Sequence, residues 1–171
     1  MEFNAQSGIG MLKENKSSAQ KSSKSLPILH EVEIIYQGPK MPLPVRITNS
    51  NECYNVLLEL YDKRKIDYKE MFFVLLLNKA NYCLGASKIG LGSTSGVQVN
   101  VKEIFQLALK MNASGIVLSH NHPSGNLSPS DADKKLTMNV KSACDCLEIT
   151  LLDHIIITSN GYFSFNDDGL M

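Results

Sequence analysis

An uninterrupted run of apolar residues, "MFFVLLL" from Met71 to Leu77, restricts the folds open to this chain more than any other segment. A strand with one solvated face alternates polar and apolar residues, whereas a continuous apolar run is typical of a strand buried on both faces. Asn78 to Asn81 then has the composition of a turn, and the strand-like "YCLGASKIG" follows it. The pattern predicts a central β-hairpin.

Two segments have the apolar spacing of amphipathic helices. "NSNECYNVLLELYDKR" follows the capping candidates Asn49 and Ser50, which predicts a helix over residues 51–64. In "NVKEIFQLALKMN", Asn100 is a candidate N-cap with Glu103 three residues later. This second helix would connect the hairpin to the next strand.

The remaining segments complete a mixed fold. "SGIVLS" predicts a short buried strand that runs directly into His120, and Ser130 begins a helix that continues to about Cys146. "EITLLDHIIITS", a turn at Asn160 and Gly161, and "YFSF" predict closing strands. Helices and strands alternate without internal repeats, so we expect one mixed β-sheet with flanking helices, of α/β or α+β class.

The first residues differ in composition from the rest. Residues 1–25 are rich in serine and lysine and poor in aromatic and β-branched residues, so they cannot bury enough surface to offset the entropy of ordering. From Glu31, "EVEIIY" alternates like an edge strand. We predict a disordered or loosely packed tail over residues 1–30 and a folded domain over residues 31–171.

The balanced charge argues against binding of nucleic acid or a membrane through the overall charge of the protein. Lysine plus arginine and aspartate plus glutamate both number 17, so binding to nucleic acid would depend on a local patch. No apolar run approaches the roughly 18 residues of a membrane span, and the N-terminus lacks the pattern of a signal peptide. We expect a cytoplasmic protein without membrane association.

The four cysteines do not form a recognisable framework. Their spacing is not that of a disulfide-rich domain, and the C-x-C formed by Cys144 and Cys146 is a weak zinc signal. Buried, reduced thiols are the expected state.

The stretch "SHNHPSGNLSPSDAD", from Ser119 to Asp133, has the residues of a metal site. Side chains two apart in an extended segment point to the same side, so His120 and His122 can face one point while Asn121 faces away. Pro123 then ends the strand, because it cannot donate to a ladder.

Asp133 falls in the first turn of the following helix, from which its carboxylate can return to the two histidines. Three protein ligands with an open fourth position are typical of catalytic zinc. However, the S-x-x-D pattern from Ser130 to Asp133 is also explained by helix capping without a metal.

Hydrolysis at such a site needs a carboxylate that accepts a proton without binding the metal. Glu70 is a candidate, because an acidic residue beside an apolar strand can be partly desolvated. A solvated strand end next to Lys69 explains Glu70 equally well from the residues alone. The other candidates lie on predicted helix surfaces or in a cap: Glu52, Glu59 and Glu103.

The stretch "HNHPSGNLSPSDAD" resembles the signature of the RadC family, a bacterial branch of the JAMM/MPN metalloprotease-like domains. The pattern is an upstream glutamate, H-x-H-P and S-x-x-D, with seven residues between His122 and Ser130 here, and with Asp133 three further on. The similarity extends to "EMFFVLLLN", "ALKMNASGIVLSHNHPSG" and "LLDHIIITSNGYFSFNDDGL", and covers roughly residues 45–171.

The resemblance implies a role for each of five residues. His120, His122 and Asp133 would hold one zinc ion per chain, Glu70 would act as general base and acid, and Ser130 would stabilise the oxyanion. It also implies the cytidine deaminase-like α/β sandwich of JAMM domains. Asp153 and His154 match a family dipeptide outside this ligand set.

A histidine in an apolar strand is more often packed and hydrogen-bonded than a ligand, so a structural role or one behind the ligands is expected for His154.

Two departures from the family are visible. Residues 1–44 lack the helix-hairpin-helix pattern of larger RadC proteins, which weakens the case for DNA binding. Val101-Lys102-Glu103 replaces the family's Pro-Arg-Glu, which alters a helix cap.

Three functions remain open at this point. The first is a zinc metallohydrolase, a metallopeptidase that cleaves an amide (peptide or isopeptide) bond in a peptide or protein substrate. The second is a DNA-associated repair or mobile-element protein, in which zinc is structural or serves nucleic-acid processing. The third is a non-catalytic protein-interaction module. The sequence does not indicate an oligomeric state.

Overall fold

The computed structural model describes residues 45–92 and 98–171. The predicted tail over residues 1–30 and the predicted edge strand from Glu31 lie outside the described residues. The elements follow in the order α1 (Ser50–Leu58), β1 (Met71–Leu77), β2 (Cys83–Leu91), α2 (Val101–Lys110), β3 (Gly115–Asn121), α3 (Asp131–Cys146), β4 (Thr150–Thr158) and β5 (Gly161–Ser164).

The strands form one mixed sheet in the order β2-β1-β3-β4-β5. β1 is antiparallel to β2 and β3, β3 is parallel to β4, and β4 is antiparallel to β5. Parallel neighbours need a long crossover, which α3 provides between β3 and β4. The predicted α/β class is confirmed.

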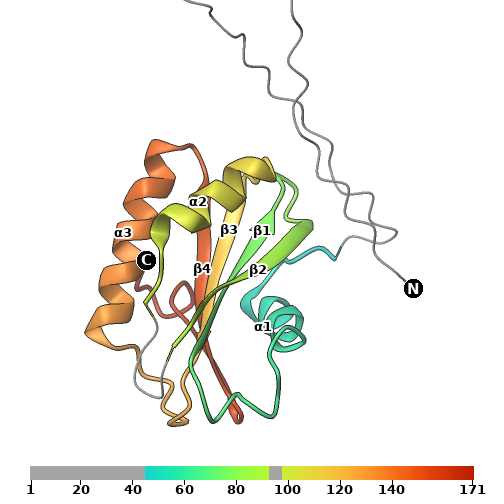
Figure 1. The fold of residues 1–171 in the computed structure, drawn as a ribbon. Helices are drawn as coiled ribbons and strands as arrows, with labels where there is room; N and C mark the ends of the chain where they lie inside the picture. The colour runs from blue at the N-terminus through green and yellow to red at the C-terminus, as the bar shows by residue number, and fades with distance from the viewer. Residues whose placement is uncertain (1–44, 93–97) are drawn as a thin grey trace, which may run out of the picture. The chain divides into compact units, whose positions relative to one another are not determined.

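The apolar run of β1 is explained by helices on both faces of the sheet, as Figure 1 shows. Alternate side chains point to opposite faces. One set packs in the core that contains α2 and α3: Phe72, Val74 and Leu76. The other set packs in the core that contains α1: Phe73, Leu75 and Leu77. Each buried side chain of this kind contributes about 1.5–3 kcal/mol.

The predicted hairpin is present, but only its first strand is central. β1 has neighbours on both sides, whereas β2 lies at the end of the five-strand order among the described residues. The side chains of Ala86 and Lys88 in β2 are exposed, which is consistent with an edge position.

The predicted end of the first helix is wrong, and the predicted N-cap of the second is confirmed. The first helix ends at Leu58 and not near residue 64, because the chain continues in turns, where the Asp62 side chain accepts a hydrogen bond from the Arg64 N–H at 3.1 Å. Asn100 is the N-cap of α2, yet its side chain makes no cap hydrogen bond. Its main-chain carbonyl accepts from the Glu103 N–H instead, at 3.0 Å.

The prediction for the cysteines is correct except at Cys146. All four thiols are free; Cys53 and Cys144 are buried, and Cys83 is partly buried. Cys146 is exposed, because two residues along an α-helix correspond to about 200° of rotation from the buried Cys144.

Within residues 45–92 and 98–171, no helix combines the length and the apolar character needed to cross a bilayer.

Candidate metal centre

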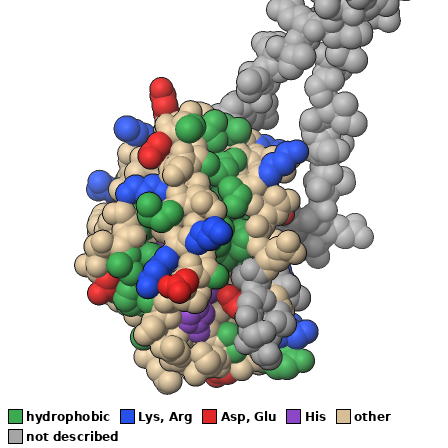
Figure 2. Space-filling view, turned by 90° about the vertical axis from the view of Figure 1, so that its left-hand side faces the viewer, with side chains coloured by type: hydrophobic (Ala, Val, Ile, Leu, Met, Phe, Trp, Pro, Cys, Tyr) green, Lys and Arg blue, Asp and Glu red, His purple; other side chains and the backbone are tan. Residues whose placement is uncertain are grey.

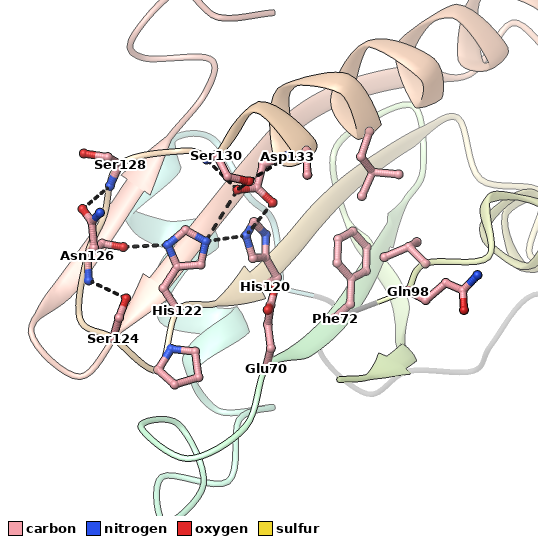
Figure 3. A pocket seen from close by; sticks show the side chains of 14 residues that line it. Glu70, Phe72, Gln98, His120, His122, Ser124, Asn126, Ser128, Ser130 and Asp133 are labelled. Atoms are coloured by element: carbon pink, nitrogen blue, oxygen red, sulfur yellow. Dashed lines mark hydrogen bonds and ion pairs between the residues drawn. The ribbon is translucent and has the colours of Figure 1, made fainter. Parts of the chain in front are cut away.

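The two histidines of the H-x-H motif meet at the end of β3. His120 lies in the strand and is 1% exposed, and His122 follows directly after it. Their Nε2 atoms are 2.9 Å apart (Figure 3). Strand alternation therefore directs both rings to one point, as predicted.

Asp133 completes a three-residue group from the first turn of α3. Its Oδ1 lies 3.1 Å from Nε2 of His120, and its Oδ2 lies 3.6 Å from Nε2 of His122. Two ligand atoms at about 2.0–2.1 Å from a tetrahedral zinc ion are about 3.3 Å apart. The spacing of these three side chains therefore fits one zinc ion, and this His-His-Asp group could hold a metal.

Capping and ligand positioning turn out to be compatible roles for Asp133. The Ser130 Oγ accepts a hydrogen bond from the Asp133 N–H at 3.1 Å, and the Ser130 N–H donates to the Asp133 Oδ2 at 2.8 Å, which makes a capping box. The Ser130 hydroxyl also donates to Oδ2, at 2.6 Å. The cap thus fixes the carboxylate with Oδ1 toward His120.

His122 is held by the loop that follows it. Its Nδ1 lies 2.6 Å from the main-chain oxygen of Asn126. A carbonyl only accepts hydrogen bonds, so Nδ1 carries the proton and the neutral ring has its lone pair on Nε2. Gly125 makes the turn possible with a φ of 77°, a left-handed conformation that favours glycine.

His120 is supported from within the core. Its Nδ1 lies 2.9 Å from Nε2 of His154, a fully buried residue of β4. The Nδ1 of His154 is 2.7 Å from the hydroxyl of Thr137 in α3. His154 therefore lies behind His120 and is not part of the three-residue group.

Asp153 has a different role. Its carboxylate accepts from Ser164 Oγ at 2.6 Å and from the Asn166 N–H at 3.1 Å. It anchors the chain after β5 and does not contact the metal ligands.

Asn121, to which the sequence assigned no role beyond facing away, holds the segment that carries Glu70. Its Oδ1 accepts from the Met71 N–H at 2.7 Å, and its Nδ2 donates to the Lys69 carbonyl at 2.9 Å. A second bond from Nδ2 reaches the Ile66 carbonyl at 2.6 Å. One side chain therefore binds both peptide groups that flank Glu70. The only hint in the sequence is a polar residue at a buried strand position.

Glu70 lies directly before β1 and is 8% exposed. Burial raises the pKa of its carboxyl group above the ordinary value, the charges of His120 and His122 oppose this rise, and Asp133 adds to it. Among the described glutamates, Glu70 alone lines the cavity beside the three-residue group.

The electrostatics favour the metal-binding, ionised form of Asp133, but they favour the charged form of His122, which must lose a proton before it can bind a metal. Burial opposes ionisation of Asp133, but hydrogen bonds from His120, His122 and Ser130 outweigh it and hold the pKa of Asp133 far below its ordinary value. The hydrogen bond with Asp133 raises the pKa of His122, so a metal would have to displace a proton from this ring. Burial lowers the pKa of His154 well below its ordinary value, so this ring is neutral.

A cavity of about 530 Å³ opens onto these residues. The five residues to which the family resemblance assigned roles all line it: Glu70, His120, His122, Ser130 and Asp133. The other candidates for the proton acceptor do not: Glu52, Glu59 and Glu103. Figure 2 shows that histidine reaches the surface on this side of the molecule. A substrate could therefore reach the site from solvent.

Comparison with known proteins agrees with the earlier resemblance. The family model for the RadC-like JAB domain matches residues 47–170. A UPF0758 protein of Flavobacterium johnsoniae is 38% identical over 125 residues, which are 73% of this chain and 53% of that protein.

A UPF0758 protein of Aquifex aeolicus is 33% identical over 150 residues, which are 86% of this chain and 62% of that protein. One from Haemophilus ducreyi is 38% identical over 118 residues, or 69% of this chain and 53% of that protein. The chain thus spans little more than half the length of these relatives.

Proposed function

Because this chain belongs to the RadC-like JAB domain family, we propose that it is a zinc-dependent hydrolase that cleaves an amide bond, of the peptide or isopeptide type. One observation carries the proposal. Two imidazoles and a carboxylate converge on one point at the wall of a cavity, and a buried glutamate lines the same cavity. A metallohydrolase needs these elements together.

His120, His122 and Asp133 would hold one zinc ion, which leaves a fourth position open. When bound, zinc would polarise the substrate carbonyl and favour a nucleophilic water at neutral pH. Nitrogen and oxygen ligands in this number suit zinc, and a group of three ligands within the described part of the chain suits a catalytic ion more than a structural one.

Glu70 would move the proton. It would accept a proton from the attacking water as the new carbon–oxygen bond forms, and then donate that proton to the amine nitrogen as the carbon–nitrogen bond breaks. The raised pKa of its partly desolvated carboxyl group suits a residue that must both take and return a proton.

Ser130 would stabilise the developing oxyanion. Its hydroxyl lines the cavity and donates to Asp133 in the structure. To serve an oxyanion, the O–H must rotate toward the substrate, and the backbone half of the capping box can hold the helix start meanwhile.

The test is a hydrolysis screen with peptide, isopeptide and nucleic-acid substrates, combined with metal analysis, on wild type and Glu70→Gln. We expect Glu70→Gln to retain zinc and to lose activity by about 10²–10⁴-fold. Glu59→Gln, at an exposed position outside the cavity, is the matched control. Unchanged turnover in Glu70→Gln would remove Glu70 from the mechanism, and cleavage of nucleic acid alone would replace the amide-bond proposal.

A further inference from the structure

We propose that Thr137 and His154 are positioning residues that fix His120 in the tautomer able to bind a metal. The inference rests on the proposed function, because His120 offers Nε2 to a metal only when its ring proton is on Nδ1. Neither Thr137 nor His154 is among the residues that line the cavity, so both act through His120.

Thr137 determines where the neighbouring His154 ring carries its proton. Its hydroxyl donates to the main-chain carbonyl of Asp133 at 2.7 Å. A hydroxyl group has one proton, so toward Nδ1 of His154, at 2.7 Å, the same oxygen can only accept. Nδ1 of His154 must therefore carry a proton.

The buried environment of His154 favours a neutral ring. The ring is fully buried and stacks on Phe165 with centroids 4.7 Å apart, an environment in which a charged imidazole would be costly. A neutral ring with its proton on Nδ1 has a lone pair on Nε2. That lone pair faces Nδ1 of His120 at 2.9 Å and needs a donor there.

The contact with His154 determines which nitrogen of His120 carries the proton. Its Nδ1 donates to His154, so Nε2 keeps its lone pair for the point shared with His122 and Asp133. The chain of hydrogen bonds thus begins at the backbone of one candidate ligand, Asp133, and ends at the ring of another, His120. A histidine that merely filled space would not require this order of donors.

The test compares Thr137→Val with Thr137→Ser. Valine keeps the branched shape of threonine and removes the hydroxyl, and serine retains the hydroxyl. Thr158→Val is the control, because Thr158 is also fully buried and its hydroxyl bonds to Gly161, outside this chain of hydrogen bonds. Long-range ¹H–¹⁵N spectra of the imidazoles report the tautomers, and titration with Zn²⁺ reports affinity.

In wild type we expect His154 and His120 to carry protons on Nδ1, and His154 to have none on Nε2, with zinc or with chelator. Thr137→Val should lose this pattern at His154 and weaken Zn²⁺ binding by about 10–100-fold, as for other residues that orient metal ligands. Thr137→Ser and Thr158→Val should bind Zn²⁺ within about twofold of wild type.

Two results would overturn the inference: a proton on Nε2 of His154 in wild type, or wild-type Zn²⁺ affinity in a folded Thr137→Val variant. If Thr137→Val does not fold, the wild-type spectra alone decide. The proposed hydrolase can fail separately. A protein with the expected tautomers that cleaves no substrate would contradict the enzyme and support the positioning role.

Discussion

His120 and His122 are separated by one residue, yet the protein holds them in opposite ways. His120 lies within β3, and its Nδ1 contacts His154, which is 34 positions away in the sequence. His122 lies beyond the strand in a glycine-containing loop, and its Nδ1 contacts the main-chain carbonyl of Asn126, four positions away. The side chains are 1% and 16% exposed, respectively.

The H-x-H motif therefore has one histidine that contributes to both the stability of the fold and metal binding, and one that contributes mainly to metal binding. The buried histidine connects the candidate metal centre to the packing of the sheet, so changes there should affect stability and metal binding together. The loop histidine depends on local geometry, so changes there should affect metal binding with less effect on the fold.

The largest expected effect compares His120→Ala with His122→Ala. Both variants should lose zinc, because each removes one of three ligands. In the presence of chelator, His120→Ala should lower the free energy of unfolding by about 2–4 kcal/mol, since it leaves a cavity and an unpaired buried ring at His154. His122→Ala should cost about 1 kcal/mol or less. Urea denaturation measures both, and equal losses would contradict the comparison.

Asn121, between the two histidines, gives the next largest effect. Asn121→Ala removes three hydrogen bonds around Glu70, two of them buried and one partly buried, so we expect a loss of about 2–3 kcal/mol in stability. Because these bonds hold Glu70 and not the ligands, hydrolysis should fall much more than zinc affinity. A variant that loses zinc and activity in equal proportion would contradict the assignment of Asn121 to the Glu70 segment.

A smaller effect is expected at Gly125, in the loop that holds His122. Gly125→Ala places a side chain at a φ of 77° although space is available, which should cost about 1 kcal/mol. Zinc affinity should fall a few-fold, and the ring signals of His154 should not change. Gly85→Ala, in open space without a positive φ, should have no effect on either.

The smallest expected effect is on the pH dependence of the chelated protein. Asp133 raises the pKa of His122 above 6.5, so the charged ring stabilises the fold fully below about pH 6.5, and this contribution is lost as the pH rises through the raised value. The difference in unfolding free energy between wild type and His122→Gln should therefore be larger at about pH 6 than at about pH 8.5.

Taking this difference cancels the opposite contribution of His154, whose lowered pKa destabilises the fold as the pH falls. A difference in unfolding free energy that grows with pH would contradict a stabilising interaction between the charged His122 ring and Asp133.

The sequence predicted best what depends on near neighbours. The direction of His120 and His122 follows from strand alternation, and the start of α3 follows from the S-x-x-D pattern. The role of Glu70 needed the family resemblance, because the residue that holds its segment, Asn121, is about 50 positions away. The chain of hydrogen bonds through Thr137 and His154 was not predictable, since it depends on how β4 and α3 pack across the sheet.

The end of α1 shows the same limit. The apolar spacing continues to Tyr61, and Tyr61 is indeed buried, with its hydroxyl 2.9 Å from Ser119 Oγ. Periodicity reports that a residue is buried, but it does not report whether the backbone is still helical at that point.

The parallel pairing of β3 with β4 also has a consequence for folding. The three candidate ligands lie within residues 120–133, whereas His154 reaches His120 only after α3 has brought β4 beside β3. The candidate ligand set is therefore local in the sequence, and we expect the unfolded chain to retain some affinity for zinc. Since binding to the unfolded state offsets stabilisation of the native state, zinc should stabilise this fold by less than its affinity for the folded protein suggests.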